Sequence, residues 1–325
     1  MARSAILSLA AAGLLAVLLS GRGGADGGPR VVTGRPAGTI VFVSDGNRLT
    51  SIDVASGRRA VRRIRSLPAC GAQLFVTGGH VVFSGVVRGR TTVFSVPISL
   101  DRRPTRLGTA HAYVPSATDG RVWLAGTDCD RRVMVGVREV AVDGRVTFES
   151  SRRVPASWVV DAVSGGLVVH HRGGLSVWDP GTGRLGRRLG LEMGFGAHGS
   201  LLAGCVARSD CDDLAIVDTA TGGTVPVRRQ LEVDAAFSPD GSLLATAARV
   251  GRRWSVALVD TRTGTATIVQ GSRTRRAYPE VAWAPTSGWL FIRDGRRIRA
   301  FQPGAPAAET LRFRLPPSAA AFAAT

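Results

Sequence analysis

A five-residue turn with the pattern D-x-x-[S/T]-G recurs along the 325-residue chain at nearly regular intervals. Four copies are intact, and they begin at Asp53, Asp179, Asp218 and Asp260. The last three begin 39 and 42 residues apart, and the first two are separated by 126 residues, which is three steps of 42. This interval predicts degenerate copies at Asp101 and Asp143, and a last one at residues 302–304. The chain therefore repeats one unit seven times.

Residues 235–264 show what one unit contains. Apolar runs at 235–237, 243–247 and 254–259 are followed by a fourth run at 265–269, and turn signals separate them. The tetrapeptide Ser238-Pro239-Asp240-Gly241 places Pro and Gly where a β-turn accepts them. Four short strands in about 40–45 residues are typical of a β-propeller blade. We therefore expect an all-β, seven-bladed β-propeller with four-stranded blades; the alternative is an all-β sandwich whose turns are regularly spaced by chance.

A second marker agrees with seven units. The first strand expected in each unit carries one aromatic residue, and these residues are Phe75, Tyr113, Trp158, Phe195, Phe237, Trp283 and Phe322. The first unit lacks such a strand at its own start, because only three strands are expected over residues 39–64. The tail at 319–325 resembles the first strand of the sixth unit. We expect this tail to complete the first blade and close the ring; the alternative is a strand at 31–33.

The N-terminus reads as an export signal. Arg3 precedes an almost wholly apolar run at 4–20, and a small-residue cleavage site ends at Ala25. The predicted organisation is a signal peptide at 1–25, a Gly-rich linker at 26–38 and the propeller domain at 39–325. An uncleaved membrane anchor is the alternative, since 17 apolar residues lie at the lower limit for spanning a bilayer. Both alternatives place the protein in the cell envelope or outside the cell.

Four cysteines in an exported chain predict two disulfides. In a propeller, the loops between second and third strands share a face with the links between blades. Cys205 and Cys211 flank one such hairpin, while Cys70 and Cys129 fall in loops of adjacent units on that same face. We expect the bridges Cys70–Cys129 and Cys205–Cys211, with reduced buried thiols as the alternative.

The net charge of +18 comes from 42 basic residues, all of them arginine. They are spread through the repeat and gather on the expected fourth strands. A fourth strand is the outer edge of a blade, where charge prevents edge-to-edge pairing. Edge protection is therefore the first interpretation, and Arg-mediated polyanion binding is the second, because a basic surface attracts anionic surfaces. No specific nucleic-acid binding is expected.

The sequence matches the phosphate-binding pattern G-x-G-x-x-G at residues 181–186, but this match falls on an expected hairpin turn with no helix to hold a pyrophosphate. No catalytic residue and no organic cofactor is predicted. Carboxylates gather on hairpin loops of the face that carries the cysteines: Asp128, Asp130, Asp210, Asp212 and Asp213. Such a group could form a binding face for Ca²⁺ or a basic ligand. The alternative is a set of solvated loop acids, because loops normally carry such residues.

With the S-P-D-G turn and the repeated D-x-x-[S/T]-G turn, residues 39–325 resemble the WD40-like and TolB-like propellers of exported bacterial proteins. The resemblance implies a rigid disc for protein or ligand contact. We therefore expect a monomeric, non-catalytic scaffold that binds an envelope protein or an extracellular ligand. The alternatives are a hydrolase or lyase with its site in the central channel, and Arg-mediated polyanion binding.

Overall fold

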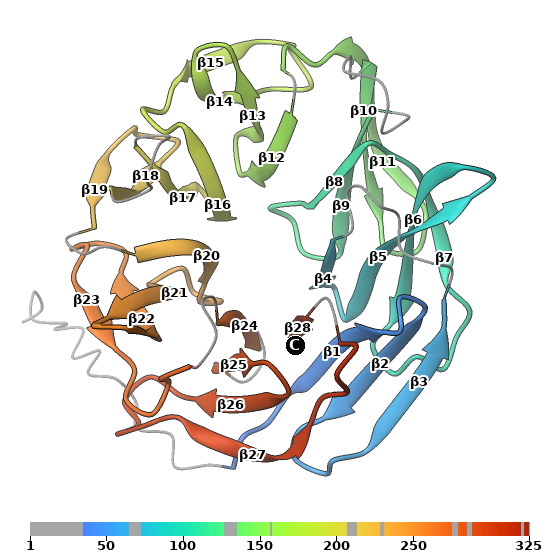
Figure 1. Cartoon of the computed structure of the whole chain (residues 1–325). Coiled ribbons are helices and arrows are strands. Elements are labelled where there is room, and N and C mark those ends of the chain that lie inside the picture. The colour runs from blue at the N-terminus through green and yellow to red at the C-terminus, as the bar shows by residue number, and fades with distance from the viewer. Residues whose placement is uncertain are drawn as a thin grey trace, which may run out of the picture.

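The computed structural model describes residues 35–64, 73–126, 135–156, 158–206, 213–227, 231–274, 279–284, 288–319 and 322–324. Within these ranges 28 strands form seven antiparallel sheets of four strands each. The sheets stand as blades around a common axis (Figure 1). The prediction of a seven-bladed, four-stranded propeller is confirmed.

Each blade runs from an inner strand near the axis to an outer strand at the rim. In this order, blade 1 contains β28 (Phe322–Ala324), β1 (Thr39–Ser44), β2 (Arg48–Asp53) and β3 (Arg59–Arg63). Blade 2 contains β4 (Leu74–Thr77), β5 (His80–Val87), β6 (Arg90–Pro97) and β7 (Thr105–Thr109). Blade 3 contains β8 (Ala112–Pro115), β9 (Arg121–Ala125), β10 (Val135–Ala141) and β11 (Val146–Arg153). Blade 4 contains β12 (Trp158–Val163), β13 (Gly166–His171), β14 (Gly174–Trp178) and β15 (Leu185–Arg188).

Blades 5 to 7 repeat the same order. Blade 5 contains β16 (Met193–His198), β17 (Leu201–Cys205), β18 (Leu214–Asp218) and β19 (Thr224–Pro226). Blade 6 contains β20 (Leu231–Phe237), β21 (Leu243–Val250), β22 (Arg253–Asp260) and β23 (Ala266–Ile268). Blade 7 contains β24 (Glu280–Ala284), β25 (Trp289–Asp294), β26 (Arg297–Phe301) and β27 (Glu309–Arg314).

The C-terminal strand closes the ring. β28 pairs antiparallel with β1, and Phe322 lies opposite Phe42 while Ala324 lies opposite Ile40. In Figure 1 the red end of the chain therefore lies beside the blue strand β1 at the centre of the ring. This confirms that the tail supplies the inner strand of blade 1.

All seven marker aromatic residues lie on the innermost strands, as predicted. They do not lie at one level, because Trp158 is the first residue of β12 whereas Phe237 is the last residue of β20. β20 also begins four residues earlier than the expected run at 235–237. Its pairing with β21 shifts register between Glu232 and Ala235, and acidic residues interrupt the apolar pattern there. The sequence pattern therefore predicted this strand too short.

The four intact D-x-x-[S/T]-G segments form the same turn between the third and fourth strands of their blades. In each, the final Gly N–H donates to the carbonyl oxygen of the Asp, over 2.8 Å at Gly57 and 2.9 Å at Gly264. The Gly has φ between +70° and +76°, which suits glycine because it has no Cβ. The Asp carboxylate also accepts a backbone N–H inside the turn, from Ser56 to Asp53 over 2.7 Å and from Thr263 to Asp260 over 2.8 Å. The pattern therefore repeats because the Asp side chain stabilises the turn and the Gly supplies its left-handed residue.

Each interface between neighbouring blades has its own apolar core. In β1, Ile40 and Phe42 pack toward blade 7, whereas Val41 and Val43 pack toward blade 2. All four side chains are at most 2% exposed. Successive side chains of a strand point to opposite faces, so a strand between two blades is apolar throughout. This explains the continuous apolar runs in the sequence.

The connections divide between the two faces of the disc. Turns between first and second strands, and between third and fourth strands, lie on one face, which we call the turn face. Hairpins between second and third strands, and the links between blades, lie on the opposite face, which we call the hairpin face. This division follows because consecutive strands of each blade are antiparallel.

Candidate binding cleft between blades 6 and 7

A cleft of about 1200 Å³ opens on the turn face between blades 6 and 7. Its blade 6 wall comes from the β20–β21 turn, the β22–β23 turn and the outer strand β23. Its blade 7 wall comes from the β26–β27 loop. The lining includes Ser238, Asp240, Leu258, Asp260, Thr267, Trp283, Phe301, Pro303 and Pro306. The volume lies somewhat above the range typical of ligand sites, about 300–1,000 Å³.

The cleft lies above the core that joins the two blades. Trp283 of β24 and Phe301 of β26 line it and also belong to that core, and they are 7% and 6% exposed. The Trp283 indole Nε1 donates to the carbonyl oxygen of Ala236 in blade 6, over 2.9 Å. At the outer side, the Ala308 N–H donates to the carbonyl oxygen of Gln270 over 2.8 Å. Hydrogen bonds between the blades therefore fix the separation of the two walls.

Two carboxylates mark the polar part of the cleft. Burial raises the pKa of Asp240, but hydrogen bonds from Ser238 and Ser242 outweigh it, so the pKa is lowered. Burial likewise raises the pKa of Asp260, and hydrogen bonds from the N–H and hydroxyl of Thr263 reverse the shift. Both groups are ionised at neutral pH. The site therefore presents fixed negative charge beside apolar side chains.

The equivalent groove between blades 7 and 1 is lined in part by residues that precede the first strand of the propeller. A cavity of about 570 Å³ on the turn face between blades 7 and 1 is lined by outer strand β27 and by the turn after Val54. Arg35 and Pro36 also line it, just before Ala37 packs against the core between blades 7 and 1. On this face, a segment of the chain that is outside any helix or strand thus forms part of the wall of a groove between two blades.

The predicted acidic binding face falls mostly outside the described residues. Asp128, Asp130, Asp210 and Asp212 lie there, so their grouping stays a prediction. Asp213 is described and exposed just before β18, on the hairpin face, where its carbonyl oxygen accepts the N–H of Val206 over 2.9 Å. No cluster of three or more His, Cys, Asp or Glu side chains suited to a metal occurs in the described part of the chain.

The predicted disulfides can be followed only at Cys205. This residue ends β17, is fully buried, and is not a free thiol. Cys70, Cys129 and Cys211 lie outside the described residues, and both pairings stay predictions. In the described ranges the structure contains no helix long and apolar enough to cross a membrane.

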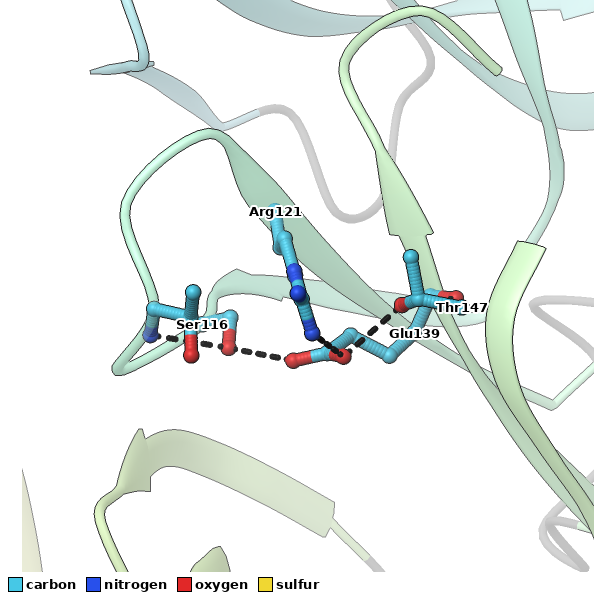
Figure 2. A network of polar contacts seen from close by, with 5 residues as sticks. Ser116, Arg121, Glu139 and Thr147 are labelled. Carbon is cyan, nitrogen blue, oxygen red and sulfur yellow. Dashed lines mark hydrogen bonds and ion pairs between the residues drawn. The ribbon is translucent and has the colours of Figure 1, made fainter. Parts of the chain in front are cut away.

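Glu139 is a buried acid that the sequence pattern did not reveal. Figure 2 shows its carboxylate between side chains from neighbouring parts of blade 3. It accepts hydrogen bonds from Ser116 Oγ at 2.6 Å, from Thr147 Oγ1 at 2.8 Å and from Arg121 Nη1 at 3.0 Å. Burial raises the pKa of Glu139, yet these three partners lower it overall. The carboxylate therefore ties the strands of one blade together and is not placed to exchange protons.

The pKa of Asp161 is raised, whereas the pKa values of the turn aspartates Asp179, Asp240 and Asp260 are lowered. It lies on inner strand β12, at a register shift relative to β13. Burial raises the pKa of Asp161 to about 7, against hydrogen bonds from the N–H groups of Ala162 and Ala197. In contrast, hydrogen bonds lower the pKa of the carboxyl groups of Asp179, Asp240 and Asp260. Among the described carboxyl groups, Asp161 is therefore the one whose pKa burial raises close to neutrality.

Sequence reasoning placed ligand binding on the hairpin face, whereas the cleft between blades 6 and 7 lies on the turn face. Its polar residues belong to the S-P-D-G and D-x-x-T-G turns, which the sequence presents only as repeat markers. Pro303 and Pro306 are a sequence signal that could have pointed to the cleft, because two prolines stiffen the β26–β27 loop that lines it. The cleft was missed because its two walls come from different blades.

The comparisons with known proteins agree with this architecture. No family model and no curated protein matches the sequence. Among solved structures, the chain is similar to TolB from Acinetobacter baumannii, with 10% identity, a TM-score of 0.51, and coverage of 88% of this chain and 66% of that one. It is also similar to the WD40 domain of Toxoplasma gondii coronin, with 15% identity, a TM-score of 0.50, and coverage of 78% and 72%.

A third similar structure is a functionally unknown protein from Desulfotomaculum acetoxidans, with 12% identity and a TM-score of 0.55. That match covers 89% of this chain and 99% of the other. At such identities the likeness concerns the fold alone, and a fold does not determine a function. The chain thus shares the propeller architecture of WD40 and TolB proteins without a detectable sequence family.

Proposed function

We propose that this propeller is a non-catalytic scaffold that binds an extended peptide segment of a partner protein in the cleft between blades 6 and 7. The segment would carry apolar side chains and one basic side chain. The observation that carries the proposal is the pairing of fixed carboxylates with an apolar lining in one preformed cleft.

Three features support this ligand. Leu258, Ile268 and the two prolines of the β26–β27 loop line the cleft and are not fully buried, so they offer apolar contact to side chains of a peptide. Asp240 and Asp260 offer negative charge to one arginine or lysine, because both stay ionised at neutral pH. The matching groove between blades 7 and 1 already lies beside the Arg35-Pro36 segment of this chain. Recognition of extended peptides in aromatic-lined grooves is a recurrent binding mode.

Binding is favoured over turnover by how the two carboxylates are held. Ser242 Oγ lies 2.9 Å from both carboxylate oxygens of Asp240, and Thr263 donates to Asp260 Oδ1 from both its N–H and its hydroxyl. These bonds hold the turns in shape, and the lowered pKa values keep both groups unprotonated. A general acid needs a proton to give near the working pH.

The test uses a phage-displayed library of random linear dodecapeptides selected against the full-length protein. We expect the enriched sequences to share one Arg or Lys flanked by apolar residues or proline. Their synthetic peptides should lose binding to T267W, because exposed Thr267 lines the cleft and an indole there would fill it.

The matched control is V61W, which places the same indole on outer strand β3, where Val61 is 61% exposed and does not line the cleft. This variant should bind the peptides as the unchanged protein does. Equal binding to T267W and V61W, or enrichment without a basic residue, would overturn the cleft as the site.

We also propose that the scaffold acts outside the cytoplasm, in the cell envelope or beyond it. The apolar run at 4–20 and the four cysteines support this location. Intact mass with and without reduction tests it on protein recovered from medium and membranes. A species that starts at Asp26 and gains four hydrogens on reduction is expected. A species that retains Met1 and has free thiols would contradict both cleavage and the bridges.

A further inference from the structure

A second hollow, about 650 Å³, lies on the hairpin face of blade 2 and is far more polar in character than the cleft. It is lined by Arg88 and Arg90 at the β5–β6 hairpin, by Arg106 and Thr109 of β7, and by Val87. The three arginines are exposed. Three arginines thus line one concave site on the face opposite the proposed peptide cleft.

The guanidinium groups of this hollow have no acidic partner among the described residues. Elsewhere in the described chain, arginines near carboxylates do form ion pairs, as Arg121 does with Glu139 and Arg293 with Glu280. Arg88, Arg90 and Arg106 form none with a described carboxylate. Their mutual repulsion is therefore not offset by the described residues that surround them.

The backbone at Arg88 is also unfavourable for its side chain. Arg88 has φ +51° and Gly89 has φ +77°, so the two central residues of the tight hairpin turn are both left-handed. Asn, Asp or Gly normally occupy the first of these positions, because other residues are strained there. A residue that is held in a strained conformation at a concave site indicates a functional role.

The hairpin that presents these arginines is rigid. β5 and β6 pair without a register shift from His80–Pro97 to Val87–Arg90. Val81, Val82 and Val93 on the two strands are fully buried between blades 1, 2 and 3. The positions of Arg88 and Arg90 are therefore fixed by a packed sheet, which lowers the entropy lost on binding.

We propose that this hollow on blade 2 binds a phosphate group. Guanidinium groups bind phosphate oxygens through paired N–H donors, and three arginines line this one hollow. The hydroxyl of Thr109 at the rim is a further donor for a phosphate oxygen. This site is separate from the peptide cleft and does not depend on the function proposed for it.

The first experiment maps inorganic phosphate on the full-length protein by ¹H–¹⁵N NMR at about 0.15 M salt, where long-range attraction is largely screened. The amides of Val87, Arg88, Gly89, Arg90 and Thr109 should shift together with one dissociation constant. Shifts spread evenly over the arginine-bearing outer strands would overturn the site, because they would show unspecific attraction.

The second experiment separates binding from folding through R88G. Glycine adopts φ +51° without strain, so the variant should melt at or above the temperature of the unchanged protein. Its phosphate affinity should nevertheless fall about tenfold, as expected for the loss of one charge-assisted contact. The matched control is R184Q, which removes one exposed charge on the turn face and should leave phosphate affinity unchanged. Equal losses in both variants would overturn the proposal.

The phosphate can come from a lipid headgroup or from a soluble ester, and two further probes separate these sources. Phosphatidylcholine vesicles containing phosphatidylglycerol test the first, and glycerol 3-phosphate tests the second. Binding of either probe that weakens in R88G supports the site and identifies its source. Failure of both probes to bind would overturn it.

Discussion

The guanidinium of Arg293 donates a hydrogen bond from Nη2 to the main-chain oxygen of Ala319, three residues before the closing strand β28. Arg293 is only 6% exposed, and its Nη1 also lies 2.7 Å from Glu280 Oε2 on the inner strand β24. Blade 7 thereby holds the segment that completes blade 1. The ring is closed by this contact as well as by the β28–β1 ladder.

We predict that R293M lowers the free energy of unfolding by about 2–4 kcal/mol, because the oxygens of Ala319 and Gly295 lose their donor in a buried place. Urea unfolding measures this change. The matched control is R48M, since Arg48 pairs with Asp45 at 3.8 Å on the exposed surface. That variant should change stability by less than about 0.5 kcal/mol. Similar losses in both variants would contradict a special role of Arg293.

Deletion of residues 318–325 should lower the melting temperature by roughly 10 °C or more. β1 would lose the strand that pairs with it, and Ile40 and Phe42 would lose apolar cover from Ala319 and Ala324. A loss of several kcal/mol shifts the melting temperature of a chain of this size by about that amount. Calorimetry or thermal circular dichroism measures it. An unchanged melting temperature would show that another segment can close the ring.

The raised pKa of Asp161 predicts how stability depends on pH. Folded protein holds a proton on Asp161 up to about pH 7, whereas the unfolded chain releases it near the usual value of 3.8. Stability contributed by this group is therefore present at low pH and is lost as the pH rises from about 4 to 7. D161N removes the ionisation, so it should raise the melting temperature at pH 8 and have little effect at pH 4.

The control for Asp161 is D179N. The hydroxyl and N–H of Thr182 and the N–H of Gly181 lower the pKa of Asp179, so its contribution has the opposite sign. That stability is present at neutral pH and is lost as the pH falls through the lowered pKa. D179N should therefore destabilise the protein at neutral pH and lose this effect in acid. Parallel pH profiles for the two variants would contradict the assignment.

Two glycines in identical turns should respond differently to alanine. Gly57 and Gly264 have φ +71° and +70°, so an alanine at either position costs about 1 kcal/mol in backbone strain. A Cβ at Gly57 would meet no atom within 4 Å, whereas a Cβ at Gly264 would collide with the carbonyl oxygen of Pro226 in blade 5. G264A should thus lower the free energy of unfolding by about 1–3 kcal/mol more than G57A. Equal losses in urea unfolding would contradict the contact.

The sequence by itself determined the number of blades, the four strands of each, the turns between third and fourth strands, and the closing tail. These features are local, because each turn is closed within five residues by a bond from the Gly N–H to the Asp carbonyl oxygen, as from Gly57 to Asp53. A turn of this kind can therefore be recognised from the sequence in every blade that keeps its Asp and its Gly. The prediction was weakest at β20, where acidic residues interrupt the apolar run.

Only the tertiary structure decided which residues meet at the cleft and at the hollow. The cleft between blades 6 and 7 joins Asp240 to Pro303, and the hollow on blade 2 joins Arg88 to Arg106 across two strands. The difference between Gly57 and Gly264 likewise depends on a neighbouring blade. Spacing along a chain records which turn a residue forms, but not which residues of another strand or blade lie opposite it. Those contacts arise only when the ring closes and the blades pack against one another.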